Sequence, residues 1–268
     1  MPLARIVMYA ATAGAIALSA WTLAVEPPPP WVAFGGLGIY LLLLVLGVVF
    51  SHWSMFADVV TEGPEGGAGV ALTFDDGPDP ETTPQVLDAL DAAGAQATFF
   101  VIGEKAERHP ELIRNIAARG HTVGIHSYHH SYWLTLRSPW FVKRELERCL
   151  AVLRPLLDEP PRLFRAPIGH VSPAMGREAK ELGLYVIGWT IKGRDGLART
   201  KAEEVVKRIS PHLRDGAIVL LHDAAERGDF VPASLPALTS VIAAAKARQL
   251  DLVSLDHWLA AGDREPIP

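Results

Sequence analysis

Two adjacent carboxylates, Asp75 and Asp76, stand at the end of a short apolar run in this sequence. Residues 69–72 lead into them and a Gly-Pro pair follows, a pattern that predicts a buried strand ending in a turn. Successive side chains of a strand point to opposite faces, so we expect different environments for the two carboxylates unless the backbone bends. One can then hold a cation while the other moves a proton. An acidic turn is the plain alternative, because Asp and Gly are common turn residues.

Two histidines four positions apart, His126 and His130, follow another apolar run. At this spacing both imidazoles can reach one cation. With Asp76 they form a two-histidine, one-carboxylate set that leaves coordination positions open, the pattern of a catalytic zinc or similar ion. A hydrogen-bonded histidine pair is the alternative, and His129 is able to exchange roles with His130.

Three further polar residues stand where predicted strands end or turn. Arg165 has apolar neighbours and needs a carboxylate partner, and Asp75 is a candidate that would stay ionised beside it. His222 follows an apolar run, and a histidine there can give a proton to a leaving group near neutral pH. Asp195 can orient and charge that imidazole, although an Asp-Gly turn also explains its segment.

Alternating strands and helices are predicted to position these side chains. Apolar runs predict strands at 69–76, 97–103, 121–125, 162–165, 184–190, 217–221 and 252–255. Helical spacing and capping residues predict helices at 82–93, 110–118, 139–157, 172–182, 201–213 and 235–248. This alternation predicts an α/β fold with a mostly parallel sheet or an irregular, seven-stranded barrel. In such folds the site gathers at the carboxyl ends of the strands.

Composition excludes several classes of protein. A chain of 268 residues can hold one large domain or two ordinary ones. The formal net charge is −5 and no lysine- or arginine-rich stripe is present, so we expect no nucleic-acid partner. The one cysteine, Cys149, excludes an internal disulfide and a thiolate metal cluster, and its helical context predicts plain packing.

Two uncharged apolar runs, residues 6–25 and 31–50, precede this domain. Each is long enough as a helix to cross about 30 Å of hydrocarbon. A glutamate and four prolines separate them, and tryptophans stand where interfacial aromatics are expected, so residues 1–57 predict a membrane anchor of two transmembrane helices. A cleaved signal peptide is the alternative for the first run, although no small-x-small cleavage site precedes the prolines.

The remaining boundaries follow from composition. Residues 58–68 form a polar, glycine-rich linker, 69–260 the α/β domain and 261–268 a tail. Arg5 and the amino terminus are the only flanking positive charges of the first run, which favours a cytoplasmic start but leaves open the side of the membrane on which the domain lies.

Four ordered motifs resemble those of the polysaccharide deacetylases with a NodB homology domain, carbohydrate esterase family 4. They are Thr-Phe-Asp-Asp-Gly-Pro at 73–78, His-Ser-x-x-His at 126–130, Arg-x-Pro-x-Gly at 165–169 and Leu-x-His at 220–222. The resemblance implies a distorted (β/α) barrel lacking one strand and one divalent ion, Zn²⁺ first, with Co²⁺ or Ni²⁺ as alternatives. It also implies hydrolysis of N-acetyl groups, which are linear amides, on amino sugars of a cell-envelope polysaccharide or lipid-linked glycan.

The resemblance carries roles onto matching positions. It implies Asp75 as the catalytic base, Asp76, His126 and His130 as metal ligands, Arg165 as the brace of the base, His222 as the general acid, Asp195 as its partner, and Leu220 and Ile168 as substrate-binding positions. In the mechanism that these residue types favour, a cation polarises the amide carbonyl and lowers the pKa of a water molecule. Asp75 takes the proton of that water and His222 protonates the leaving amine.

The chain departs from the family pattern at several positions. Ala166 and Ile168 replace a proline and an aromatic residue in the third motif. The fourth motif, Asp-x-x-Asp-Trp, keeps only its second aspartate, Asp195, which leaves the groove shape and the acyl-group size open. An O-acetyl (xylan-type) esterase and a membrane-tethered carbohydrate-binding module without catalysis are the alternative functions.

Overall fold

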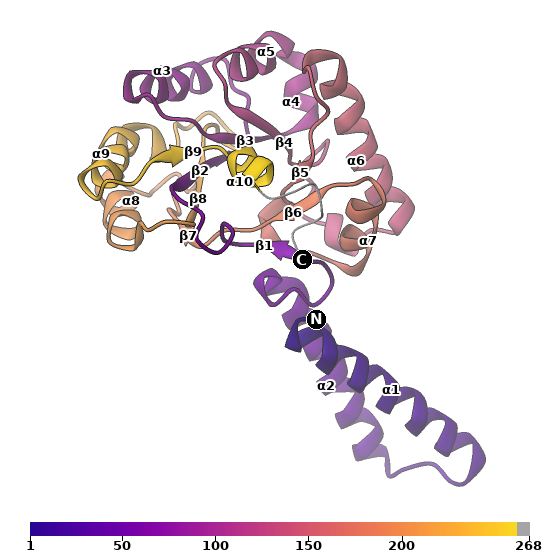
Figure 1. Ribbon diagram of the computed structural model, residues 1–268. Coiled ribbons are helices and arrows are strands. Elements are labelled where there is room, and N and C mark those ends of the chain that lie inside the picture. The colour runs from indigo at the N-terminus through magenta and orange to yellow at the C-terminus, as the bar shows by residue number, and fades with distance from the viewer. Residues whose placement is uncertain (262–268) are drawn as a thin grey trace.

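Parallel strands alternate with helices from residue 59 onward in the computed structural model, which describes residues 1–261 (Figure 1). The strands are β1 (Val59–Val60), β2 (Val70–Asp75), β3 (Thr98–Val101), β4 (Thr122–Ile125), β5 (Leu163–Phe164), β6 (Tyr185–Ile187), β7 (Ile191–Lys192), β8 (Ile218–His222) and β9 (Leu252–Val253). They pair in the order β1-β6-β5-β4-β3-β2-β8-β7, with β9 on β2, and every ladder is parallel. The tail expected at 261–268 lies outside the described residues except for Ala261.

All seven predicted strands are present, and the α/β fold class is confirmed. Two further strands, β1 and β7, have only two residues each, too few to show a periodic pattern. β1 lies within the expected linker and pairs with β6, and Gly188 donates its backbone N–H to the carbonyl of Val60 (2.8 Å). An antiparallel bridge between Glu62 and Ala217 then joins this segment to the start of β8, so the two ends of the sheet approach each other as a distorted barrel.

Helices surround the strands (Figure 1). They are α3 (Thr83–Ala93), α4 (Gly103–Arg108), α5 (Pro110–Ala118), α6 (Pro139–Leu153), α7 (Pro173–Glu181), α8 (Ala202–Ile209), α9 (Ser234–Ala247) and α10 (Leu255–Ala261). A serine cap followed by a proline begins two of these helices. The hydroxyl of Ser138 accepts from the backbone N–H of Phe141 at the start of α6, and the hydroxyl of Ser172 accepts from that of Met175 at the start of α7. The sequence predicts two helices that end at residues 157 and 213, but α6 ends at Leu153 and α8 at Ile209. Each is followed by a 3₁₀ turn that contains a proline, η3 (Arg154–Leu156) or η5 (Ser210–His212).

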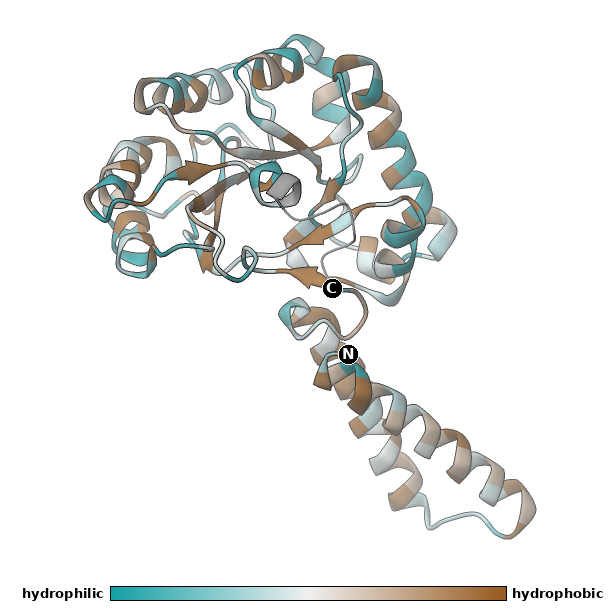
Figure 2. Cartoon of the chain, viewed as in Figure 1, coloured by the Kyte–Doolittle hydropathy of each residue, from teal (hydrophilic) through white to brown (hydrophobic). Residues whose placement is uncertain are grey.

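The main core lies between the strands and the helices. Phe74 of β2 and Phe99 of β3 stack at its centre with ring centroids 5.1 Å apart, and both are completely buried. Cys149 is buried on α6, as predicted. Figure 2 shows the corresponding pattern, with brown apolar strands inside and teal hydrophilic positions on the helices.

A smaller core fills the amino end of the barrel. Trp258 and Leu255 of α10 pack there with Phe100 and other buried strand residues. The indole N–H of Trp258 donates to the carbonyl of Ala68 (3.0 Å). Figure 1 shows α10 lying across the strands, so this end of the barrel is closed by a helix. The sequence pattern predicts a strand up to residue 255 and misses α10.

Two helices project from the side of the barrel, α1 (Leu3–Ala24) and α2 (Pro30–Val49) (Figures 1 and 2). Both are long and apolar enough to cross a membrane, by length and composition. The hydroxyls of Thr12 and Tyr40 lie 2.9 Å apart and link the pair. The predicted helical hairpin is therefore present.

Truncating the aromatic core tests this packing. Phe99→Ala should lower the free energy of unfolding by about 3–5 kcal/mol, because it removes a fully buried ring and leaves a cavity. Denaturant unfolding of the purified chain in detergent measures the change. Leu136→Ala is the control, since this leucine is 76% exposed and should change stability by less than about 0.5 kcal/mol. Equal effects of the two substitutions would contradict the assignment of this core.

Candidate metal centre

Asp76, His126 and His130 converge beyond the carboxyl ends of β2 and β4. Oδ1 of Asp76 lies 3.4 Å from Nε2 of His130 and 3.7 Å from Nε2 of His126. One ligand atom from each residue lies within 4.8 Å of the others, and all three side chains are buried. Among residues 1–261, no hydrogen-bond partner reaches the buried Oδ1 of Asp76. A buried anionic oxygen that faces two imidazole nitrogens fits a divalent metal ion, so the chain carries an Asp-His-His metal site.

Local backbone bends create this convergence. Asp76 follows the last residue of β2 with a left-handed backbone (φ 74°), and Ser127 and His130 are also left-handed (φ 64° and 52°). The bend at Asp76 brings its carboxylate into the same buried site as that of Asp75. In a regular strand the side chains of Asp75 and Asp76 would point to opposite faces. The backbone bends at Asp76, so the two carboxylates share one site. The hydroxyl of Ser127 accepts from the backbone N–H of His130 (3.1 Å) and fixes the second bend.

Neighbouring groups orient the imidazoles. Nδ1 of His126 donates to the carbonyl of Arg165 (2.7 Å), which leaves Nε2 with its lone pair toward Asp76. Burial lowers the pKa of His126 to about 3, so the ring is neutral, and burial raises the pKa of Asp76 to about 6. Nδ1 of His130 lies 3.0 Å from Oε1 of Glu226, a neighbour that sequence patterns do not reveal.

His129 lies outside this set. Its Nδ1 is 2.7 Å from Oε1 of the buried Glu145, and its backbone N–H donates to the other oxygen of that carboxylate (3.0 Å). The exchange of roles between His129 and His130 that the sequence left open is therefore not seen in the structure.

Asp75 is held by the fully buried Arg165. Nη1 of Arg165 donates to Oδ1 of Asp75 and to the hydroxyl of Thr73, both at 2.7 Å, and Nη2 donates to the carbonyl of Gly188 (2.9 Å). Burial raises the pKa of Asp75, but the charges of Arg165, first of all, and of His222 outweigh it and hold the pKa below its ordinary value. Asp75 is therefore an ionised carboxylate beside the metal site, 3.8 Å from Nε2 of His126.

His222 pairs with Asp195 and faces Oδ2 of Asp76, whereas His126 and His130 face Oδ1 of that carboxylate. Nδ1 of His222 lies 3.2 Å from both carboxylate oxygens of Asp195, and its backbone N–H donates to Oδ2 (2.7 Å). Burial lowers the pKa of His222, but Asp195 first of all, with Asp76 and Asp75, raises it to about 9. Nε2 of the resulting imidazolium is 3.9 Å from Oδ2 of Asp76.

Gly196 explains the altered fourth motif. A Cβ atom at this position would lie 2.9 Å from Nδ1 of His222 and 3.0 Å from its Cε1. Gly196 occupies the position of the tryptophan in the family motif. A larger side chain on this backbone would displace the imidazole of His222, so the close approach of this loop to His222 requires a glycine here.

The two expected substrate-binding positions differ in exposure. Leu220 is buried within β8, whereas Ile168 is 43% exposed on the turn η4 (Pro167–Gly169). The backbone of Ile168 is left-handed (φ 53°), which an isoleucine rarely adopts. This strained turn directly follows the Arg165 motif.

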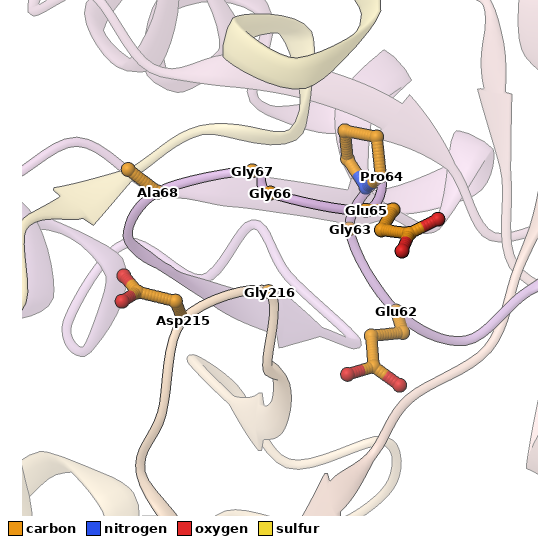
Figure 3. A pocket seen from close by; sticks show the side chains of 9 residues that line it. All are labelled: Glu62, Gly63, Pro64, Glu65, Gly66, Gly67, Ala68, Asp215 and Gly216. Carbon is orange, nitrogen blue, oxygen red and sulfur yellow. The ribbon is translucent and has the colours of Figure 1, made fainter.

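The hollow shown in Figure 3 belongs to the other end of the barrel. Its walls, around Gly67 and Asp215, precede β2 and β8, whereas Asp75 and His222 end these strands. Two of its three acids already have partners, since Asp215 accepts from the backbone of Gly69 (2.7 Å) and Glu62 pairs with Arg214. It therefore contributes nothing to the metal centre.

Comparisons with known proteins agree with this geometry. A family profile described as polysaccharide deacetylase matches residues 62–187. The chain is 33% identical over 203 residues to a peptidoglycan-N-acetylglucosamine deacetylase of Bacillus cereus, covering 75% of this chain and 92% of the relative. This chain belongs to the polysaccharide deacetylase family. The expected resemblance, fold and hydrolase class are confirmed.

Solved structures of this family share the deacetylase fold. The Bc1960 peptidoglycan N-acetylglucosamine deacetylase is 29% identical with a TM-score of 0.72, covering 78% of this chain and 95% of that chain. A family 4 acetyl xylan esterase from Clostridium thermocellum, solved with a cobalt ion, is 31% identical with a TM-score of 0.65, covering 72% and 90%.

Removal of the carboxylate tests the metal site of the deacetylase. Asp76→Asn should weaken metal binding strongly, because it removes the one anionic ligand. Loss of a residue that only supports a ligand typically costs roughly 10–100-fold in affinity, and loss of the ligand itself should cost more. Metal content after dialysis, measured by elemental analysis, reports the change. Asp223→Asn is the control, since this carboxyl is equally buried but lies outside the three-residue set. Full metal content in Asp76→Asn would contradict the assignment.

Proposed function

We propose that this polysaccharide deacetylase removes N-acetyl groups from amino sugars of a cell-envelope glycan. The observation that carries the proposal is the arrangement of three differently charged groups at one end of the barrel. An ionised Asp75 and a positively charged His222 lie on either side of the Asp-His-His site, each within 4 Å of one of its members. Hydrolysis of an amide needs a proton acceptor for water and a proton donor for the amine, and these two groups supply them.

The metal contribution is electrostatic. A divalent ion held by Asp76, His126 and His130 would polarise the acetyl carbonyl and lower the pKa of a water molecule. We assign Zn²⁺ as the resident ion because two imidazoles and one carboxylate with open positions suit it, with Co²⁺ and Ni²⁺ as alternatives.

The residues of the chain supply the remaining steps. Asp75 accepts a proton from the attacking water, and Arg165 keeps this carboxylate ionised and oriented. The backbone N–H of Ile168, on its left-handed turn, donates to the oxyanion of the tetrahedral intermediate, a contribution of about 3–4 kcal/mol. His222, charged through Asp195, protonates the nitrogen as the C–N bond breaks, and acetate and a free amine result. Leu220 forms a wall of the acyl pocket.

The substrate class follows from the relatives and from the anchor. The named relatives include deacetylases of peptidoglycan N-acetylglucosamine, and α1 and α2 would hold the domain of residues 69–260 at a membrane, with 58–68 as the connection. An integral membrane anchor is favoured over a signal sequence because two apolar helices of spanning length follow each other as a hairpin, whereas a signal sequence has a single apolar segment. An O-acetyl esterase is the second candidate, since the acetyl xylan esterase shares the fold at 31% identity.

Replacing the general acid tests this function. The purified full chain, loaded with Zn²⁺ in detergent, should release acetate from N-acetylglucosamine oligomers faster than from a chromogenic acetate ester. His222→Ala should lower kcat by about 10²–10⁴-fold because the amine then leaves without a proton, while metal content stays unchanged.

Each other outcome excludes one part of the proposal. Loss of metal from His222→Ala would show that His222 is a ligand. Cleavage of the ester alone would favour the esterase, and inactivity at full metal occupancy on a range of oligomers would favour a binding module.

The Asp195–His222 pair predicts a shift in the pH profile. Asp195→Asn removes the main negative charge that raises the pKa of His222, so the imidazolium loses its proton at lower pH. The alkaline limb of kcat/KM should move down by roughly one pH unit or more. Asp158→Asn, an exposed acid, is the control. An unchanged alkaline limb in Asp195→Asn would show that this histidine does not limit the rate at high pH.

A further inference from the structure

The end of the hairpin and the third catalytic motif share one hollow of about 270 Å³. Phe50 and His52, which follow α2, form one wall. Ile168 and His170, on the turn after Arg165, form another, and Trp189 and Lys192 close it. The hollow is therefore built from both the anchor and the catalytic domain.

Hydrogen bonds fix the anchor against this domain. The backbone N–H of Val171 donates to the carbonyl of Val48, near the end of α2 (3.2 Å). The guanidinium of Arg5 donates to the carbonyl of Ser54 (2.9 Å) and to the carboxylate of Asp58 (2.8 Å). The end of the hairpin is thus held on the turn that carries Ile168, with few residues between α2 and β1.

Trp189 connects the hollow to the catalytic groups. Its ring lies 5.9 Å from the guanidinium of Arg165, and a Cβ atom on Gly169 would lie 2.1 Å from it. The neighbouring Gly188 also lines the hollow, and its carbonyl accepts from Arg165, the brace of Asp75. A molecule in the hollow therefore lies beside the residues that position the catalytic base.

The charge of the hollow favours an anion. Lys192, His52 and His170 line it, and no aspartate or glutamate does. The ammonium of Lys192 lies 5.3 Å from the centre of the Trp189 ring. Within residues 1–261, no ion pair involves any of these three cationic or titratable side chains. Free donors beside an aromatic face, at the end of an apolar helix, fit a phosphate group at the surface of a membrane.

We propose that this hollow binds the phosphate of a polyprenyl-linked N-acyl amino sugar, so that the deacetylase takes a lipid-linked intermediate at the membrane surface as its substrate. The inference rests on the proposed function and on the membrane anchor. A wall polymer would require a domain with free reach, whereas this anchor is docked on the catalytic turn and contributes a side chain to the hollow. The sugar joined to this phosphate would lie on the Arg165 side of the hollow, where Trp189 and Gly188 contact that residue.

The decisive experiment compares two substrates with the full chain in phosphatidylcholine nanodiscs. One is N-acetylglucosamine joined through phosphate to a polyprenyl chain, and the other is a water-soluble N-acetylglucosamine trimer. Lys192→Gln should lower kcat/KM for the lipid-linked sugar by about tenfold or more, because a charge-assisted contact to phosphate is lost. It should leave kcat/KM for the trimer within about twofold, since no contact ties Lys192 to the metal centre. Lys207→Gln, an exposed lysine on α8, should change neither value.

Equal losses on both substrates, or no loss on the lipid-linked one, would overturn the inference. His52→Gln offers a second variant from the anchor side of the hollow and should reproduce the selective loss.

Binding of polyprenyl phosphate without a sugar separates this inference from the proposed function, because that lipid cannot be deacetylated. The wild-type chain should bind a fluorescent polyprenyl phosphate, and Lys192→Gln should bind it about tenfold more weakly or worse. Binding without any deacetylase activity would count against the proposed function alone. Equal competition by phosphatidylglycerol would show that the hollow takes any phospholipid headgroup and would overturn the assignment to a lipid-linked sugar.

Discussion

The buried ion pair between Arg165 and Asp75 is the constraint on which the rest of the site depends. Removing both charges from water costs several kcal/mol for each ion. The 2.7 Å contact offsets this cost together with three further acceptors of the guanidinium, the Thr73 hydroxyl and the carbonyls of Gly188 and Ile187. The same residue fixes the metal site, since its backbone carbonyl accepts from His126. One arginine thus holds the carboxylate of Asp75, orients a metal ligand and begins the turn that contacts the end of α2.

The two neighbouring aspartates show how one sequence motif yields two chemical roles. They share the same ordinary pKa, yet Arg165 holds the pKa of Asp75 low while burial raises that of Asp76 to about 6. Asp75 therefore stays a proton acceptor. Burial raises the pKa of Asp76 more than the nearby cations His222 and Lys105 lower it, and a metal ion between this carboxylate and the histidines would provide further compensating charge.

Sequence patterns predict the strand and helix alternation because each buried strand is an apolar run and the buried positions of helices such as α3, α5 and α6 recur at helical spacing. They miss β1 and β7, which are too short for periodicity, and α4, which has six residues. The motifs bring the right side chains to one end of the barrel. They do not reveal the left-handed bend at Asp76, nor Glu145 and Glu226 beside the histidines, because these contacts form between segments that carry no shared local signal.

The helix across the amino end of the barrel has a consequence for the order of product departure. Within the described residues, Trp258 and Leu255 fill that end of the barrel and block its axis on the side away from the metal site. Acetate would then leave by the opening that admits the sugar. Both products would share one route, and acetate would compete with the next acyl group for the same position.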